Sequence, residues 1–308
     1  MNKIPLVVIA GPTASGKTRL AIDVAKKFNG EIVSADSMQI YKYMNIGTAK
    51  PTAAERAECT HHLIDFVEPD AEFSVADYTV LAHKVIADIT ARGRLAVMCG
   101  GTGLYIDSVV NDVPFGEQDT DYEMRKELND LAEREGGERL LEILAEFDPV
   151  SAQRLHPNNL RRIIRAIEFY RTTGVPISEH QEMTKRIESR YEPVMFCINH
   201  TRDILYERIN IRVDMMLEEG LADEVKSLMD MGYAKDMNSM KGIGYKEMMT
   251  YFNGECTLEE AVEAVKQGTR RYAKRQLTWF RRDKRIISLA PEKAWLAASQ
   301  IISDRLKI

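Results

Sequence analysis

The most constraining feature of this sequence is a glycine-rich turn between an apolar run and an amphipathic one. The turn reads Gly11-Pro12-Thr13-Ala14-Ser15-Gly16-Lys17-Thr18. The run Leu6 to Ala10 predicts a buried strand before it, and the run from about Lys17 to Phe28 predicts a helix after it. In this context the glycines let successive amides point inward, and the helix start adds positive potential. The pattern predicts a P-loop that binds a phosphate chain, with Lys17 on phosphate oxygens and Thr18 on Mg²⁺.

A P-loop does not by itself define the reaction. The alternative of a chance match on a turn is disfavoured by the strand expected before the motif and the helix expected after it. A bound phosphate chain is nevertheless compatible with phosphoryl transfer, with other transfers and with simple binding. Residues elsewhere in the chain must therefore indicate the function.

Short apolar runs alternate with longer amphipathic ones, a pattern typical of parallel strands joined by crossover helices. Each apolar run is continuous enough to be buried on both faces of a sheet. The runs predicted to be strands are Leu6 to Ala10, Glu31 to Ser34, Leu95 to Cys99, Val194 to Ile198 and Ile286 to Leu289. The sequence thus predicts an α/β fold, a P-loop NTPase-like parallel sheet with helices on both faces.

Two of the connecting helices have clear boundaries. Ser74 with Asp77 three residues later forms a capping box for a helix that runs to about Arg92, where Gly93 ends it. The run Asp203 to Glu219, followed by Gly220, predicts another helix.

The connection between the third and fourth strands is too long for a simple crossover. It spans roughly 95 residues with a helical pattern throughout. Pro114 and Gly116 mark its start, and Pro193 marks the return to the sheet. We therefore expect an inserted small all-helical domain at 117–192 within a catalytic core formed by 1–116 and 193–308.

Composition favours a cytoplasmic protein without a membrane anchor. No basic start is followed by a long apolar run, so neither a signal peptide nor a membrane span is predicted. The four cysteines, Cys59, Cys99, Cys197 and Cys256, are far apart and form no CxxC pair. Neither a zinc site nor a disulfide framework is therefore expected.

Charge is unevenly distributed. The net charge of −5 argues against a nucleic-acid partner, but the average hides local potential. Carboxylates dominate from Glu117 to Asp148, whereas basic residues dominate from Arg270 to Arg285. A second basic cluster comprises Arg154, Arg161, Arg162, Arg165 and Arg171.

Two further features follow strands and should lie at the same sheet edge as the P-loop, where ligands of open α/β sheets bind. Asp36 follows the second strand and could accept a proton or hold a magnesium-bound water; alternatively, it caps a local turn. The turn Gly100-Gly101-Thr102-Gly103 follows the third strand and could line a channel; alternatively, its glycines only allow tight packing. The adjacent His61 and His62 suit a metal poorly because they point apart in an extended chain.

The set of motifs resembles one family. The segments, in chain order, are GPTASGKT, ADSMQIY, IGTAKPT, HHLID, GGTGLY, NLRRIIRAIE, LYERINIRVD, GIGYKE and YAKRQLTWFRR. Together they cover most of the chain and resemble the bacterial tRNA dimethylallyltransferases, also called tRNA isopentenyltransferases. This resemblance implies transfer of the dimethylallyl group of dimethylallyl diphosphate to the N6 amine of the adenosine 3′ of the anticodon. It also implies that the partners are the tRNA anticodon stem-loop, dimethylallyl diphosphate and Mg²⁺. The sequence leaves the oligomeric state open, and a monomer is the default expectation.

The resemblance also assigns roles to residues. Gly11 to Thr18 would hold the diphosphate, with Thr18 on Mg²⁺, and Arg212 would assist, with Arg208 as a weaker candidate. Asp36 would be the general base, and Lys17 and Thr102 would complete the catalytic set. The tRNA contacts would be Asp36, Ser37, Met38, Gln39 and Thr102 in the channel, with Arg125, Asn159, Leu160, Arg161, Arg162, Ile163 and Arg165 in the insertion.

Several readings stay open from the sequence alone. The arginines of the insertion could form a solvated helix face, and Trp279 with Phe280 could be either core or a stacking platform for bases. The main alternative function is a P-loop kinase of a small metabolite or nucleotide. A nucleotide-switch module is disfavoured because no NKxD motif is present. A free-adenylate isopentenyltransferase is disfavoured by the basic helical insertion.

Overall fold

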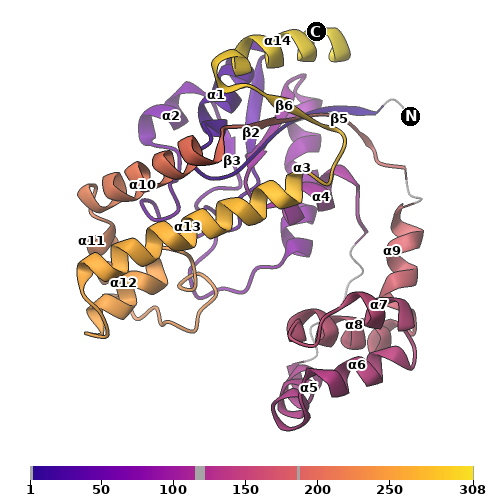
Figure 1. The fold of residues 1–308 in the computed structure, drawn as a ribbon. Coiled ribbons are helices and arrows are strands. Elements are labelled where there is room, and N and C mark those ends of the chain that lie inside the picture. The colour runs from indigo at the N-terminus through magenta and orange to yellow at the C-terminus, as the bar shows by residue number, and fades with distance from the viewer. Residues whose placement is uncertain (1–2, 115–121, 186–187, 308) are drawn as a thin grey trace. The chain divides into compact units, whose positions relative to one another are not determined.

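The computed structural model of the protein describes residues 3–114, 122–185 and 188–307, which form two compact units (Figure 1). One unit comprises Met1–Val110 with Arg190–Ile308, and the other comprises Asn111–Ser189. Gly116 and the expected boundary between 116 and 117 lie outside the described residues. The expected boundary between 192 and 193 falls within a strand of the first unit.

The first unit is built on a six-stranded parallel sheet with the order β3-β2-β4-β1-β5-β6. The strands are β1 (Ile4–Ala10), β2 (Gly30–Ser34), β3 (His61–His62), β4 (Leu95–Gly100), β5 (Tyr191–Ile198) and β6 (Ile286–Leu289). The predicted α/β fold class is confirmed. The sequence did not indicate β3, because this edge strand has only two half-buried histidines and no apolar run.

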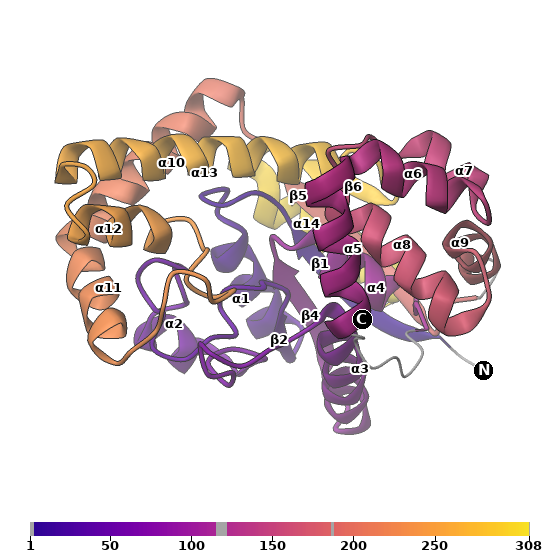
Figure 2. The same ribbon diagram turned by 90° about the horizontal axis from the view of Figure 1, so that it is seen from below.

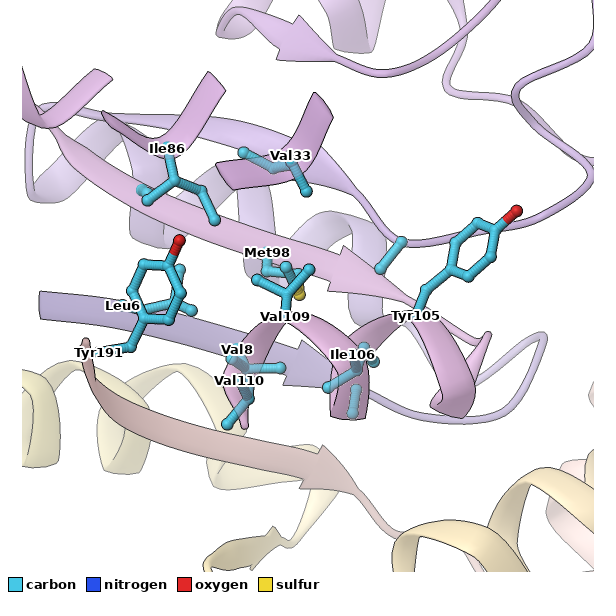
Figure 3. Packing of buried hydrophobic residues seen from close by; sticks show 14 of the residues in the cluster. Leu6, Val8, Val33, Ile86, Met98, Tyr105, Ile106, Val109, Val110 and Tyr191 are labelled. Atoms are coloured by element: carbon cyan, nitrogen blue, oxygen red, sulfur yellow. The ribbon is translucent and has the colours of Figure 1, made fainter. Parts of the chain in front are cut away.

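Helices cover both faces of this sheet because alternate side chains of β1 point to opposite sides. Leu6 and Val8 belong to a core layer with α3 (Val75–Ala91) and α4 (Gly103–Val110), shown in Figure 3. Val7 and Ile9 belong to the opposite layer, which contains α1 (Lys17–Lys27) and α14 (Ala294–Leu306). Each fully buried aliphatic side chain contributes about 1.5–3 kcal/mol, so these two layers provide much of the unit's stability.

A third apolar cluster lies outside the sheet layers. It joins the loop after β2 to the helices α10 (Arg202–Glu218), α11 (Leu221–Asp230), α12 (Tyr245–Phe252) and α13 (Leu258–Phe280). Figures 1 and 2 both show α13, the longest helix, lying beside α10 and α12. Two short elements complete the unit: α2 (Ala53–Glu58) and a single 3₁₀ turn at Pro291–Lys293.

The predicted helix boundaries agree with the structure. Ser74 accepts a bond from the amide of Asp77, and the Asp77 side chain accepts one from the amide of Ser74, so the capping box at the start of α3 is present. The helix predicted from Asp203 is α10, and Gly220 after it has a φ of 98°, a conformation that suits glycine.

The second unit consists of helices packed around its own apolar cluster. The helices are α5 (Tyr122–Glu135), α6 (Gly137–Ala145), α7 (Pro149–Arg154), α8 (Leu160–Thr173) and α9 (Ile177–Lys185). Leu140, Leu144 and Ile167 are fully buried at the centre of this cluster. Asp148 caps α7 by accepting from the amide of Ser151, and it also accepts from the hydroxyl of Ser178 in the first turn of α9. Among the described residues, no helix of either unit is long and apolar enough to cross a membrane.

The sheet order places a topological switch at β1. The chain passes from β1 to β2 on one side, whereas β5 pairs with β1 on the other side. In open α/β sheets such a point forms a crevice at the carboxyl ends of the strands. The Gly11–Thr18 turn follows β1 directly and therefore lies at this crevice.

A buried carboxylate lies at the opposite end of the sheet, near the start of β2. Glu31 is 2% exposed and accepts bonds from Arg92, from Arg94 at 2.9 Å and from His62 at 2.7 Å. The hydrogen bonds from Arg92, assisted by His62, lower the pKa of Glu31 from 4.5 to about 2. The stabilisation from its charged form is therefore complete above pH 4.5 and is lost as pH falls toward 2.

Replacing Glu31 with Gln should lower the free energy of unfolding at pH 7 by about 1–3 kcal/mol, because buried donors lose a charged acceptor. The variant should also lose stability less steeply than the wild type between pH 4.5 and 2. Urea unfolding at several pH values measures both effects. Asp88→Asn, which changes an exposed carboxylate that also contacts Arg92, is the matched control. Parallel pH curves for Glu31→Gln and the wild type would contradict the assignment.

Candidate active site

The turn after β1 has the backbone of a phosphate-binding loop. Gly11, Ala14 and Gly16 have φ values of 151°, 61° and 91°, conformations that direct amides toward the inside of the turn. Gly16 is the N-cap of α1, so the first amides of that helix face the same space. Lys17 Nζ donates to the carbonyl of Pro12 at 3.2 Å, which holds the ammonium group across the loop.

Other elements hold the outside of this loop. Arg208 Nε on α10 donates to the carbonyl of Ala14 at 2.8 Å, and His200 Nε2 lies 3.0 Å from the carbonyl oxygen of Ser15. Ser15 is 2% exposed, and its hydroxyl has no hydrogen-bond partner within the described part of the chain. The loop is thus fixed from outside and keeps a buried polar group unpaired.

The site concentrates positive charge. Burial lowers the pKa of Lys17, and it also lowers the pKa of Arg212 on α10; nearby Asp36 acts in the opposite direction on both. Neither Lys17 nor Arg212 forms an ion pair in residues 3–114, 122–185 and 188–307. Two partly desolvated cations without a counter-ion favour the binding of an anion.

Asp36 lies at this sheet edge, as its position after β2 predicts. Its Oδ1 accepts from the amides of Met38 at 3.0 Å and Gln39 at 3.4 Å. The capping role considered as an alternative is therefore present. It does not separate Asp36 from the P-loop, because the carboxylate lines the same cavity as Lys17 and Thr18.

The second glycine-rich turn packs very closely against its surroundings. A Cβ atom on Gly100 would lie 2.1 Å from the carbonyl oxygen of Ala35, and one on Gly101 would lie 2.2 Å from Gln276 Nε2. Thr102 follows these two glycines. Its Oγ1 accepts from the amide of Ser37 at 2.9 Å and donates to the hydroxyl of Ser37 at 3.2 Å. The tight packing that the sequence left as an alternative thus fixes Thr102 beside the segment that follows Asp36.

Helix α13 carries residues that the sequence did not single out. Gln276 is 5% exposed; its Oε1 accepts from the amide of Thr13 at 3.2 Å, and its Nε2 donates to the carbonyl of Gly101 at 2.9 Å. Tyr272, one turn earlier, lines the same cavity as Gln276 and Asp36, and burial raises the pKa of its hydroxyl. Their spacing of four on one helix was the available signal.

The aromatic pair at the end of α13 is core rather than an exposed platform. Phe280 is 4% exposed within the layer that contains α3 and α4. Trp279 packs against the same layer, and its Nε1 donates to Asp107 Oδ2 at 2.7 Å. A side chain on Gly103 would collide with the indole ring of Trp279 at 2.3 Å. The pair therefore anchors α13 to α4.

Two cavities meet at the P-loop. The P-loop cavity has a volume of about 810 Å³ and is lined by residues 14–19 with Arg56, Arg208 and Arg212. The Asp36 cavity has a volume of about 310 Å³ and is lined by residues 36–39 with Tyr272, Arg275 and Gln276. Residues that line both cavities are Lys17, Thr18, Ala49, Arg212 and Met216. The two cavities could thus hold two reactants on either side of the same cations.

The donor set of these cavities fits a magnesium ion that accompanies phosphate. Thr18 and Asp36 both line the Asp36 cavity and could supply a hydroxyl and a carboxylate. The residues described contain no cluster of three or more His, Cys, Asp or Glu side chains that could hold a metal alone. A divalent cation that accompanies phosphate can take one or two protein ligands and complete its shell with water and phosphate oxygens.

The candidate tRNA contacts of the second unit differ in exposure. Arg161, Arg162 and Arg165 are exposed on α8, after the N-cap residue Asn159 and the partly buried Leu160. The side chain of Ile163 is fully buried in the cluster of this unit. Arg125 Nε forms an ion pair with the buried carboxylate of Glu168 at 2.9 Å, an interaction that the sequence pattern did not indicate.

The basic run Arg270 to Arg285 is divided between structural and exposed roles. Arg270 donates to Asn210 Oδ1 at 2.7 Å, and Arg285 pairs with Asp283 at 2.6 Å. The exposed basic residues of the run are Arg271, Lys274, Arg275, Arg281, Arg282, Lys284 and Arg285.

Comparisons with known proteins agree on one family. A sequence model of the family described as IPP transferase matches residues 39–283. The tRNA dimethylallyltransferase of Lachnoclostridium phytofermentans is 49% identical over 99% of this chain and 97% of its own length. That of Caldanaerobacter subterraneus subsp. tengcongensis is 54% identical over 90% of this chain and 89% of its own length.

Solved structures show the same similarity. The full-length tRNA isopentenylpyrophosphate transferase of Bacillus halodurans aligns with a TM-score of 0.74 and 44% identity, covering 100% of this chain and 97% of that one. A eukaryotic dimethylallyltransferase acting on tRNA aligns with a TM-score of 0.80 and 28% identity, covering 97% of this chain and 78% of that one.

The packing of the second glycine-rich turn gives a testable expectation. Gly100→Ala should lower the free energy of unfolding by about 1–3 kcal/mol, because a methyl group meets the Ala35 carbonyl and the backbone beside Asp36 must shift. Gly268→Ala on α13 is the matched control. Its added methyl group makes an ordinary 3.4 Å contact with Ile243, and alanine favours helix by up to about 1 kcal/mol. Urea unfolding compares the two; equal stability would refute the clash.

Proposed function

The chain belongs to the IPP transferase family, and from this premise we propose that it is a prenyltransferase acting on tRNA. It transfers the dimethylallyl group of dimethylallyl diphosphate to the N6 amine of the adenosine 3′ of the anticodon, giving N6-isopentenyladenosine and diphosphate. The observation that carries this proposal is the pair of cavities that share Lys17 and Arg212, with the P-loop in one and Asp36 in the other.

The diphosphate of the donor binds at the P-loop. Amides of the loop and of the helix start supply hydrogen bonds, and Lys17 and Arg212 supply the charge. Pro12, whose carbonyl accepts from Lys17, shapes the first part of the turn. Binding of the prenyl diphosphate in this family needs a divalent cation; we assign it as Mg²⁺, which Thr18 would hold and which would help to neutralise charge on the leaving group.

Residues of the two cavities fit the chemistry of allylic transfer. As the carbon–oxygen bond of the donor breaks, diphosphate departs with the electron pair and cationic character develops on the allylic carbon. Lys17 and Arg212 stabilise the negative charge that grows on the leaving group. The N6 amine forms the new nitrogen–carbon bond, and Asp36 accepts the proton that the amine releases. No covalent enzyme intermediate is needed.

The adenosine must leave its stack to reach Asp36, and bases in a loop are the easiest to extrude. We propose that the extruded base lies in the Asp36 cavity against Ser37, Met38 and Gln39. We also propose that Thr102, which bonds to Ser37, contacts the tRNA next to this base. In the second unit, we propose that Asn159, Leu160, Arg161, Arg162 and Arg165, with Arg125 nearby, contact the anticodon stem-loop backbone. We further propose a cytoplasmic monomer.

Replacing Asp36 with Asn keeps an acceptor for the Met38 amide but removes the base. We expect turnover to fall roughly 10²–10⁴-fold while the affinity for dimethylallyl diphosphate changes little. Labelled dimethylallyl diphosphate, Mg²⁺ and an unmodified anticodon stem-loop measure turnover, and calorimetry with the diphosphate measures binding. Near-normal turnover of the variant would disprove the base assignment. Label on free AMP but not on RNA, or phosphorylation of a metabolite by ATP, would instead disprove the proposed reaction.

Replacing both Arg161 and Arg162 with Ala tests the role of the second unit. We expect a lower kcat/KM for the stem-loop and a salt dependence whose slope decreases by about 2, because two phosphate contacts are lost. Binding of dimethylallyl diphosphate should not change. Arg139→Ala, on the exposed side of α6, is the control for a general loss of charge. The proposal fails if the double variant keeps the wild-type salt slope.

A further inference from the structure

Glu224 on α11 binds the backbone of the loop that follows Tyr41. Its Oε2 accepts from the amides of Asn45 and Ile46, both at 2.8 Å, and its Oε1 accepts from the amide of Gly47 at 3.1 Å. Tyr245 on α12 donates its hydroxyl to the same Oε1 at 2.7 Å. Three consecutive amides therefore converge on a single carboxylate, as amides of a backbone nest converge on an anion.

The loop depends on this carboxylate because it has little regular structure of its own. Ala49 has a φ of 51°, and Gly47 lies so close to the ring of Tyr245 that a Cβ atom would meet it at 2.6 Å. Tyr245 is fully buried, so the ring cannot move aside cheaply. Lys50 Nζ reinforces the loop by donating to Asn45 Oδ1 at 3.2 Å. Without Glu224, three aligned amides would lack their common acceptor.

The other side of the loop faces the reaction site. The carbonyls of Thr48 and Ala49 accept from Gln39 Nε2 at 3.2 and 3.0 Å. The amide of Gln39 in turn donates to Asp36 Oδ1 at 3.4 Å. Ala49 lines both cavities. A continuous series of hydrogen bonds thus connects Glu224 to Asp36 through the loop and Gln39.

We propose that Glu224 is a positioning residue that, together with Tyr245, holds the wall between the two cavities and thereby sets the orientation of Gln39 and Asp36. The proposal rests on the function proposed above. Glu224 does not line either cavity and acts only through the loop backbone. Its removal should therefore impair the alignment of the acceptor base more than it impairs binding of the diphosphate at the P-loop.

The first test needs no substrate. In Glu224→Gln, the side-chain NH₂ group presents donors where the amides need an acceptor, so hydrogen–deuterium exchange at the amides of residues 45–47 should rise at least about tenfold. Exchange in β1 and β4 should stay at the wild-type level. Asp223→Asn removes an exposed carboxylate from the same helix turn and should leave residues 45–47 unchanged. Wild-type protection of residues 45–47 in Glu224→Gln would overturn the proposal.

The second test measures labelled prenyl transfer to the anticodon stem-loop. Glu224→Gln should reduce kcat roughly 10- to 100-fold, with the KM for dimethylallyl diphosphate within about threefold of the wild type. Gln39→Ala alone should also reduce kcat, and the double variant should lose little more than either single variant, because both act through one series of bonds. Additive losses would overturn the proposal, as would a KM effect without a kcat effect.

Tyr245→Phe covers the case in which Glu224→Gln does not fold. This variant keeps the Glu224 carboxylate and removes only the hydrogen bond from the Tyr245 hydroxyl. Amide exchange at residues 45–47 should therefore rise and kcat should fall, each by less than in Glu224→Gln. A wild-type protein that transfers no label to RNA would refute the proposed function alone, since the exchange experiment still decides whether Glu224 holds the loop. If Glu224→Gln does not fold, and Tyr245→Phe has the same amide exchange and the same kcat as the wild type, the positioning role of Glu224 is overturned.

Discussion

The site depends on keeping two cations, Lys17 and Arg212, partly desolvated at the end of β1. Burial lowers the pKa of each, which shows that the fold works against their charge. Nearby Asp36 opposes this effect on both groups. The scaffold fixes this arrangement, and the diphosphate that we propose to bind here would supply the missing counter-charge. Affinity for the donor and stability of the empty site therefore oppose each other.

Helix α13 provides much of that fixation. Gln276 joins the amide of Thr13 in the P-loop to the carbonyl of Gly101 in the second turn. Trp279, at the end of the helix, donates to Asp107 on α4. A displacement of α13 would thus move both glycine-rich turns together. One helix therefore fixes the P-loop and the second glycine-rich turn relative to each other. Transfer between two bound reactants requires such a fixed geometry.

The sequence predicted those parts of the fold and site that depend on local patterns. Five strands were expected because their apolar runs are continuous, and the proximity of Asp36 to the P-loop followed from the rule that parallel strands end at one edge. The structure added β3, whose pairing comes from the neighbouring strand and not from its own two histidines. Gln276 was missed because its partner Thr13 is 263 positions away, and the burial of the Ile163 side chain was not apparent because a motif does not reveal which side chain faces the core.

The residues missed by sequence share a physical character that explains why they matter. Gln276 and Glu224 are polar side chains that bond to backbone groups of distant loops. Such bonds carry no local signature, since any loop offers amides and carbonyls. They are nonetheless required here, because glycine-rich turns have high conformational freedom and cannot hold a reactive geometry alone. The P-loop and Asp36 supply the chemistry, and remote polar anchors reduce the entropy of the loops on which that chemistry takes place.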